Sequence, residues 1–171
     1  IDDEIQHLKP HILFLEEKGY SLTTVTNGQD GAAVIKENNF DLVLLDQTMP
    51  GMDGLQTLIE IKKITQNQLI IMITKTEDEW LMDEAIHSQV DQFLIKPVNP
   101  SQIFMACKQA LEKNNLQRQK ATSDYLKEFH NIEMVIKNNQ SADDWFRLYN
   151  QLVEWQIKFD NYKDIGLINI L

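Results

Sequence analysis

One stretch of this sequence constrains the fold more than any other. Residues 40–46 are apolar at five of seven positions and end at Asp46, and a proline and two glycines follow over 47–54. A short apolar run bounded by turn residues is typical of a strand that is buried on both faces of a parallel sheet. Ligands bind beyond the carboxyl ends of such strands, so Asp46 stands where chemistry is expected. Taken alone, this aspartate is equally typical of a residue that only caps the next turn.

The first two thirds of the chain alternate between strand and helix patterns. Short apolar or β-branched runs predict further strands over 21–25, 69–73 and 92–95. Apolar residues at helical spacing predict helices over 4–19, 27–38, 55–64, 79–88 and 100–111. Pro10 lacks a backbone N–H, so we expect the first helix to bend or to start late there. This alternation predicts an α/β domain whose parallel sheet is covered on both faces.

The two ends of the chain carry different signals. Asp2 and Asp3 follow a single residue, so if they end a strand, most of that first strand precedes residue 1. Past about residue 114 the strand patterns stop, and helical stripes follow at Leu126, Phe129, Ile132 and Ile136, and at Trp145, Leu148, Leu152, Trp155 and Phe159. We therefore expect a domain over 1–113 and a small all-α segment over 114–171. Either a third helix over 165–171 or a partner is needed to cover the two stripes.

Composition and charge exclude several classes of function. No apolar segment reaches the roughly 18 to 20 residues that a membrane-spanning helix needs, so no membrane insertion is expected. The one cysteine, Cys107, cannot form an internal disulfide, which agrees with a reducing, cytoplasmic location. Residues 1–113 hold 18 acids and 9 bases, and 114–171 hold 8 acids and 7 bases. Neither part offers the basic face that direct nucleic-acid binding requires.

The expected strand ends carry a set of polar side chains that belong together chemically. The carboxyl ends of parallel strands share one edge of the sheet. This edge should therefore gather the side chains of Asp2, Asp3, Asp46, Thr74 and Lys96. Three carboxylates so close repel one another unless a cation sits among them. Oxygen ligands with room for water select a hard divalent ion, and Mg²⁺ fits best.

The residue types then suggest a reaction. Asp46 can attack a phosphoryl group and become an aspartyl phosphate. Charge on the transferring group can be neutralised by Mg²⁺ on one side and by Lys96 on the other. Thr74 can donate a hydrogen bond to a phosphoryl oxygen once one is present. Each residue alone has an ordinary structural explanation, but their joint order and spacing is specific.

These residues resemble a known family. Asp2-Asp3, Leu45-Asp46 with Met49-Pro50-Gly51-Met52-Asp53-Gly54, Thr74 and Lys96-Pro97 are similar to the signature of the CheY-like receiver domains of bacterial two-component response regulators, over roughly residues 1–112. The resemblance implies a flavodoxin-like doubly wound parallel sheet of order 2-1-3-4-5. It also implies a cis peptide bond between Lys96 and Pro97.

The resemblance also assigns roles to residues of this chain. It implies that Asp46 is the phospho-acceptor and that Thr74, Phe93 and Lys96 form the switch. The implied Mg²⁺ ligands are Asp2, Asp3, Asp46 and the backbone carbonyl of Thr48. The implied partner is a sensor histidine kinase, with homodimer formation on phosphorylation. A receiver of this kind is a phospho-accepting regulator and not an enzyme.

A narrower resemblance concerns the whole chain. The Ile73-Thr74-Lys75 strand end, the run over 94–100 and the helical region from Trp145 to Trp155 are similar to PorX-type regulators. In those proteins a receiver and a three-helix bundle precede a PglZ domain, and the whole regulates type IX secretion. The PglZ domain is absent from this sequence, so none of its metal sites or activity is carried onto these residues.

Two other functions and one other metal site stay open at this point. Haloacid-dehalogenase-like phosphatases also use a strand-end aspartate, but they place a second aspartate two residues later, where this chain has Thr48. A phosphorylation-independent interaction module is the other alternative. His7 and His11 lie four residues apart and could share a metal, but Pro10 lies between them and no third ligand is evident, which favours ordinary surface or boundary histidines.

Overall fold

The computed structural model describes residues 1–75, 90–138, 145–146 and 149–154. The chain divides into two compact units, Ile1–Glu112 and Lys113–Leu171. The helix expected over 79–88, most of the second helical stripe and the segment 165–171 lie outside the described residues.

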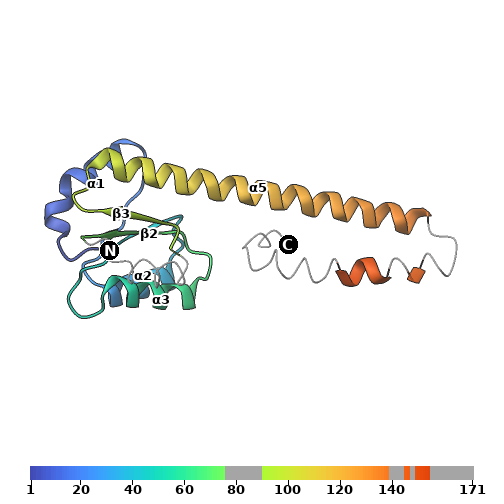
Figure 1. Cartoon of the computed structure of the whole chain (residues 1–171), viewed down its shortest axis with the longest axis horizontal. Helices are drawn as coiled ribbons and strands as arrows, with labels where there is room; N and C mark the ends of the chain where they lie inside the picture. Colours follow the sequence, from blue (N-terminus) through green and yellow to red (C-terminus); the bar gives the residue numbers. More distant parts are fainter. Residues whose placement is uncertain (76–89, 139–144, 147–148, 155–171) are drawn as a thin grey trace. The chain divides into compact units, whose positions relative to one another are not determined.

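A three-stranded parallel sheet forms the centre of the first unit (Figure 1). Its strands are β1 (Val43–Asp46), β2 (Ile70–Thr74) and β3 (Gln92–Ile95), in the order β1-β2-β3. Every residue of β2 is buried, because the strand has a neighbour on each side and helices on both faces. The three strands that were predicted from apolar runs ending at 46, near 74 and at 95 are therefore confirmed.

The strand predicted over 21–25 was wrong, since these described residues carry no strand. Its place beside the sheet is nevertheless as expected. Asp2 N donates to Val25 O at 3.1 Å, while Ile1 N donates to Leu44 O at 2.8 Å and Asp46 N donates to Ile1 O at 2.9 Å. Residues 1–2 thus lie between Val25 and β1, as the order 2-1-3-4-5 requires. One hydrogen bond to Val25 is not the repeated ladder that defines a strand.

The helices of the first unit begin and end at recognisable signals. A 3₁₀ helix, η1 (Ile5–Leu8), leads into α1 (Lys9–Glu17), whose first turn contains Pro10, so the late start is confirmed. Asn27 caps α2 (Gly28–Glu37) by accepting from Asp30 N at 2.8 Å. Asp53 and Gln56 form a capping box at the start of α3 (Gly54–Ile64).

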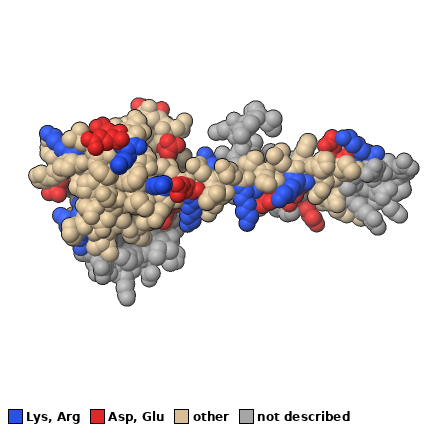
Figure 2. All heavy atoms as spheres, turned by 90° about the horizontal axis from the view of Figure 1, so that it is seen from above, with Lys and Arg blue, Asp and Glu red and all other residues tan. Residues whose placement is uncertain are grey.

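Helix α5 (Pro100–Asn138) is one continuous helix of 39 residues. The expectation of separate helices on either side of residue 114 was wrong. The sequence after Pro100 contains no glycine or proline up to Asn138, so nothing in it ends the helix. Ion pairs along the exposed surface add support, as between Lys137 and Glu133 at 2.7 Å. Acidic and basic side chains are interspersed along the face that Figure 2 shows.

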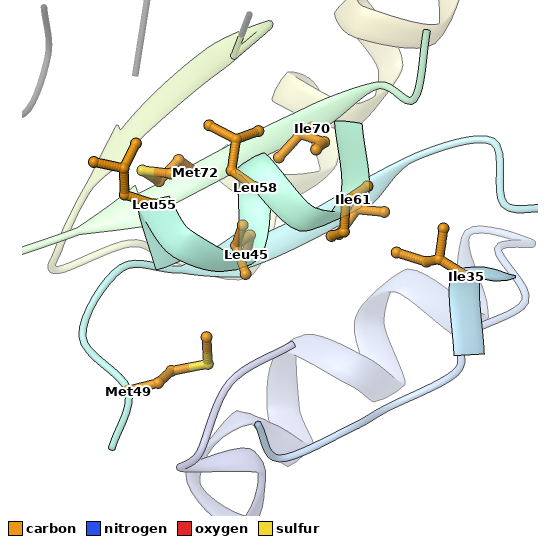
Figure 3. Close-up of a cluster of buried hydrophobic side chains, with 9 residues drawn as sticks. Ile35, Leu45, Met49, Leu55, Leu58, Ile61, Ile70 and Met72 are labelled. Atoms are coloured by element: carbon orange, nitrogen blue, oxygen red, sulfur yellow. The ribbon is translucent and has the colours of Figure 1, made fainter. Parts of the chain in front are cut away.

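Two apolar layers enclose the sheet. On one face, α2 and α3 pack against the strands, and Figure 3 shows Leu58 and Ile61 of α3 pointing toward Leu45, Ile70 and Met72. All five of these side chains are completely buried. On the other face, α1 and the first turns of α5 cover β2 through Leu15, Ile71, Ile73, Ile103, Ala106, Cys107 and Ala110. Full burial of one large apolar side chain is worth about 1.5–3 kcal/mol, so these layers fix the strands and their ends.

A cavity of about 570 Å³ lies beside the sheet in the first unit. It is bordered by α1, the segment 21–25, β1 and the start of α5, and its lining includes Asp46 and Lys96. Most of its lining is apolar, as at Leu22, Leu44 and Ile103.

None of the helices in the described part of the chain is long and apolar enough to span a bilayer. In the second unit, the described apolar residues of the helical stripes include exposed side chains at Leu126, Phe129, Trp145 and Leu152.

The packing of α2 against α3 makes a testable prediction. A Cβ at Gly28 would overlap Thr57 Oγ1 and lie 3.1 Å from Met52 Sδ. Gly28→Ala should therefore lower the free energy of unfolding by about 1–3 kcal/mol, although alanine favours helix. Adding Thr57→Ala should recover part of that loss. Denaturant unfolding measures this, with the exposed Gln29→Ala as a neutral control; a Gly28→Ala protein as stable as the wild type would contradict the close packing.

Candidate functional site

Three carboxylates meet at the carboxyl edge of the sheet. Asp46 is the last residue of β1, and Asp2 and Asp3 lie beside it, each with an oxygen within 4.8 Å of the others. The side chains of Asp46 and Asp2 are nearly excluded from water, with residue exposures of 3% and 4%, while Asp3 is exposed. The predicted gathering of acids is therefore present in the geometry, with one side open to solvent.

Lys96 supplies the positive charge of this cluster. Its Nζ lies 2.8 Å from Asp46 Oδ1 and 3.7 Å from Asp2 Oδ2. Its backbone N–H donates to Thr74 O at 2.7 Å, so the residue after β3 stays aligned with the end of β2. The other oxygen of Asp2, Oδ1, accepts from Glu4 N at 2.8 Å. One ammonium group thus bridges two carboxylates that come from the start and the middle of the first unit.

The predicted switch residues lie on the two neighbouring strands. Thr74 ends β2 one position beyond Ile73, which is opposite Asp46, and its side chain is buried. Phe93 lies opposite Met72 in β3 and packs half-buried against the core on the α3 side. Thr48 is exposed in the turn after β1, and its role as a carbonyl ligand stays a prediction. The peptide bond between Lys96 and Pro97 is cis, as expected.

Gly54 has a role that the sequence pattern did not reveal. A Cβ on this residue would lie 2.5 Å from Asp46 O and 2.6 Å from Gln47 Cα. The turn after β1 therefore folds back directly onto the strand end, and Gly54 N donates to Gln47 O at 2.9 Å. Pro50, Gly51 and Gly54 close together in sequence indicate a turn, but only the geometry shows that Gly54 is needed for close approach.

Burial and charge act in opposite directions on the site. Burial raises the pKa of Asp46, and the Lys96 ammonium offsets this only in part, while Asp2 and Asp3 raise it further. Burial lowers the pKa of Lys96, but the carboxylates of Asp46 and Asp2 outweigh it, so the net pKa is raised. The ammonium is therefore retained at neutral pH, and the ionised Asp46 is left with too little positive charge around it.

The donor set fits a hard divalent cation. It consists of carboxylate oxygens, two buried and one exposed, which is the chemistry that Mg²⁺ selects and which leaves room for water or a phosphate. A cation there would counteract the burial and the repulsion from Asp2 and Asp3 that together raise the pKa of Asp46. Among the residues that the structure describes, no other group of three His, Cys, Asp or Glu side chains lies this close together.

The histidines behave differently from one another. His7 is exposed, whereas His11 is half-buried and its Nε2 lies 3.0 Å from Val98 O. Among the described residues, neither histidine belongs to a group of three potential metal ligands. The sequence pattern did not predict the contact, because it joins residues 87 positions apart.

Comparison with known families decides what kind of domain this is. Residues 1–125 match the family described as the response regulator receiver domain. The chain belongs to this family. Residues 115–171 match a second family, described as the PorX response regulator linker domain. The resemblance to a receiver domain of PorX type is thereby confirmed.

Relatives and solved structures agree with this assignment. The chain is 29% identical over 113 residues to the transcriptional regulatory protein SrrA of Staphylococcus aureus, covering 66% of this chain and 46% of SrrA. It thus spans about half the length of the curated relatives it matches.

Among structures, it resembles a CheY-like receiver domain protein from Methanospirillum hungatei, at 27% identity and a TM-score of 0.63, covering 66% of this chain and 90% of that one. It also resembles a receiver domain protein from Clostridium thermocellum, at 30% identity and 0.62, covering 68% and 94%. These likenesses confirm the flavodoxin-like α/β fold of the receiver domain.

The electrostatics of the receiver domain predict a pH-dependent stability. The folded state holds the Asp46 proton more tightly than the unfolded chain does, so stability is lost as pH rises through the raised pKa. Asp46→Asn removes this loss. Without divalent cations it should raise Tm by a few degrees at pH 7, and the gain should shrink as the pH falls below the pKa of Asp46.

Thermal unfolding across pH in the presence of a chelator measures the effect. Asp41→Asn is the matched control, because Asp41 is an exposed aspartate of the same segment. A gain that is the same for both variants, or that does not change with pH, would show that burial of Asp46 is not its cause.

Proposed function

We propose that this receiver domain accepts a phosphoryl group on Asp46 from a sensor histidine kinase and that Asp2, Asp3, Asp46 and the Thr48 carbonyl hold the Mg²⁺ ion required. One observation carries the proposal: Asp46 is buried at the end of β1 with two further carboxylates within 4.8 Å and the Lys96 ammonium at 2.8 Å. A carboxylate that merely capped a turn would need neither the neighbouring acids nor the lysine.

The reaction requires little covalent chemistry from the protein. An Asp46 oxygen attacks phosphorus in line with the leaving group, the new P–O bond forms, and the bond from phosphorus to the kinase imidazole breaks, so that the imidazole leaves with the electron pair. The bound Mg²⁺ supplies positive charge for the phosphoryl oxygens. Lys96 neutralises a further oxygen from the opposite side, and the buried strand end keeps Asp46 oriented.

The signal would then be read through the neighbouring strands. A phosphoryl group adds about −1.5 to −2 charge and three acceptor oxygens. Thr74 at the end of β2 can donate a hydrogen bond to one of them. Phe93 is half-buried against the core, and we expect it to turn inward when Thr74 moves. We expect this rearrangement of Thr74 and Phe93 to favour a homodimer. The coupling free energy between phosphorylation and dimer formation should be about 1–3 kcal/mol.

The second unit indicates which process the receiver domain could regulate. Residues 115–171 match the linker domain of PorX response regulators, which supports a role in regulating type IX secretion through a further domain. The location in the cytoplasm, where a histidine kinase would meet this domain, is part of the same proposal.

Acetyl phosphate provides the direct test. With Mg²⁺ it should add the mass of one phosphoryl group to the wild-type protein, and chelation of Mg²⁺ should abolish the labelling. Asp46→Asn should remain unlabelled, and Lys96→Ala should be labelled at least tenfold more slowly, because a preorganised charge of this kind is worth about 10²–10³ in rate. Intact-protein mass spectrometry measures both, with Asp41→Asn as the exposed control that should be labelled normally.

The same experiment separates the alternatives. A wild-type protein that stays unlabelled under conditions that label other receivers would refute the proposal. Sustained hydrolysis of a generic phosphate ester that is lost in Asp46→Asn would indicate a phosphatase instead. Light scattering with and without beryllium trifluoride, in wild type and Asp46→Ala, would reveal a phosphorylation-independent module if the mass is the same in all four samples.

A further inference from the structure

His11 occupies a position on α1 where the neighbouring inward residues are apolar. Leu15, one turn later, is buried in the core between α1, the sheet and α5. The half-buried imidazole of His11 contacts the loop after β3, and its Nε2 lies 3.0 Å from Val98 O. This polar contact links the helix that follows the acidic pair to the loop that carries Lys96.

The chemistry of the contact fixes the form of the imidazole. A carbonyl oxygen only accepts hydrogen bonds, so Nε2 must carry the proton and donate. In the neutral ring Nδ1 then has no proton, and in the structure this atom is buried without a hydrogen-bond partner. A leucine would fill the same space without burying an unpaired polar atom. Packing alone therefore does not explain a histidine here, whereas the Nε2–H donor does.

The loop between β3 and α5 has few other anchors. At its start, Lys96 N donates to Thr74 O at 2.7 Å. At its end, Asn99 and Gln102 exchange two hydrogen bonds of 2.9 Å that begin α5. Pro97 has no N–H to donate. Among the described residues, the hydrogen bond from His11 to the Val98 carbonyl is therefore the contact that fixes the middle of the loop, two residues after Lys96.

We propose that His11 is a positioning residue of the receiver domain: its Nε2–H holds the Val98 carbonyl and thereby keeps the Lys96 ammonium against Asp46. This inference rests on the proposed phosphoryl transfer to Asp46. It adds a residue that lies outside the acidic cluster and that touches neither the phosphoryl group nor the metal. Because Lys96 acts through its position, a shift of its backbone slows the reaction even though its charge is unchanged.

Three variants separate the hydrogen bond from the bulk of the side chain. His11→Leu keeps the volume and removes the donor, and His11→Gln retains an N–H donor at a similar reach. His7→Leu is the matched control, because His7 is an exposed histidine one turn earlier. With acetyl phosphate and saturating Mg²⁺, labelling of His11→Leu should be about tenfold slower than wild type, since small misplacements of a charged group cost factors of this size. His11→Gln should recover to within about threefold, and His7→Leu should match wild type.

A double-mutant comparison shows whether the effect passes through Lys96. In a Lys96→Ala background, His11→Leu should slow labelling by less than about twofold further, since the group that it positions is gone. The ¹⁵Nζ resonance of Lys96 gives a second readout that does not depend on activity: it should shift in His11→Leu and return in His11→Gln.

The outcomes distinguish this inference from the proposed function. Wild-type rates in His11→Leu would overturn the inference and leave the acceptor role of Asp46 intact. The same tenfold loss in the Lys96→Ala background, or a slow His11→Gln with an unshifted Lys96 resonance, would assign His11 a general structural role instead. An unlabelled wild-type protein would refute both proposals together.

Discussion

Two aspartates that are almost excluded from water face one another at the edge of this sheet, and a single ammonium group serves both. Asp46 and Asp2 contribute two buried negative charges, Asp3 adds a third at the surface, and Lys96 is the basic side chain that pairs with them among the described residues. Buried charge is tolerated only when it is paired, so the cluster is stable as a set and not as separate residues. The rest of the receiver domain keeps these three carboxylates and the ammonium group close together.

The sheet positions the cluster through strands whose side chains before the reactive end are apolar and buried. Leu45 precedes Asp46, and Met72 precedes the end of β2 by two residues, and both are completely buried. A shift of one residue in the pairing of β1 with β2 would turn these side chains to the opposite face and withdraw Asp46 from the edge. Apolar packing on both faces therefore fixes the register, and the register sets where the carboxylate stands.

The sequence predicted those parts of the molecule that depend on local patterns. The strands ending at Asp46 and Thr74 are continuous apolar runs, which the sequence shows directly. Because the carboxyl ends of parallel strands share one edge of the sheet, the sequence alone was enough to predict that the acids and Lys96 meet there. The prediction of a strand over 21–25 was wrong because a strand requires repeated hydrogen bonds to a neighbouring strand. The residue pattern of the segment itself does not show whether such a neighbour is present. The continuity of α5 was missed because the helix was ended near residue 111 and a new helical stripe was begun at Leu126, although the residues between contain no glycine or proline.

The contacts that sequence patterns did not predict are long-range and depend on exact distances. Gly54 is needed because the turn returns to within van der Waals reach of Asp46 O, and His11 reaches a carbonyl 87 residues away. Both residues have an ordinary local explanation, as a turn glycine and as a boundary histidine. Their roles follow only when the three-dimensional neighbours are known, which is why residue spacing could identify the reactive groups but not the residues that position them.

The electrostatics of Lys96 explain why positioning residues matter at this site. The carboxylates of Asp46 and Asp2 raise its pKa despite partial burial, so the lysine keeps its charge at neutral pH wherever the loop places it within the cluster. What varies is distance: Lys96 Nζ lies 2.8 Å from Asp46 and 3.7 Å from Asp2, and an interaction between charges weakens as their separation grows. The backbone of the loop, and not the protonation of the lysine, therefore controls how much of that charge reaches the oxygen that reacts.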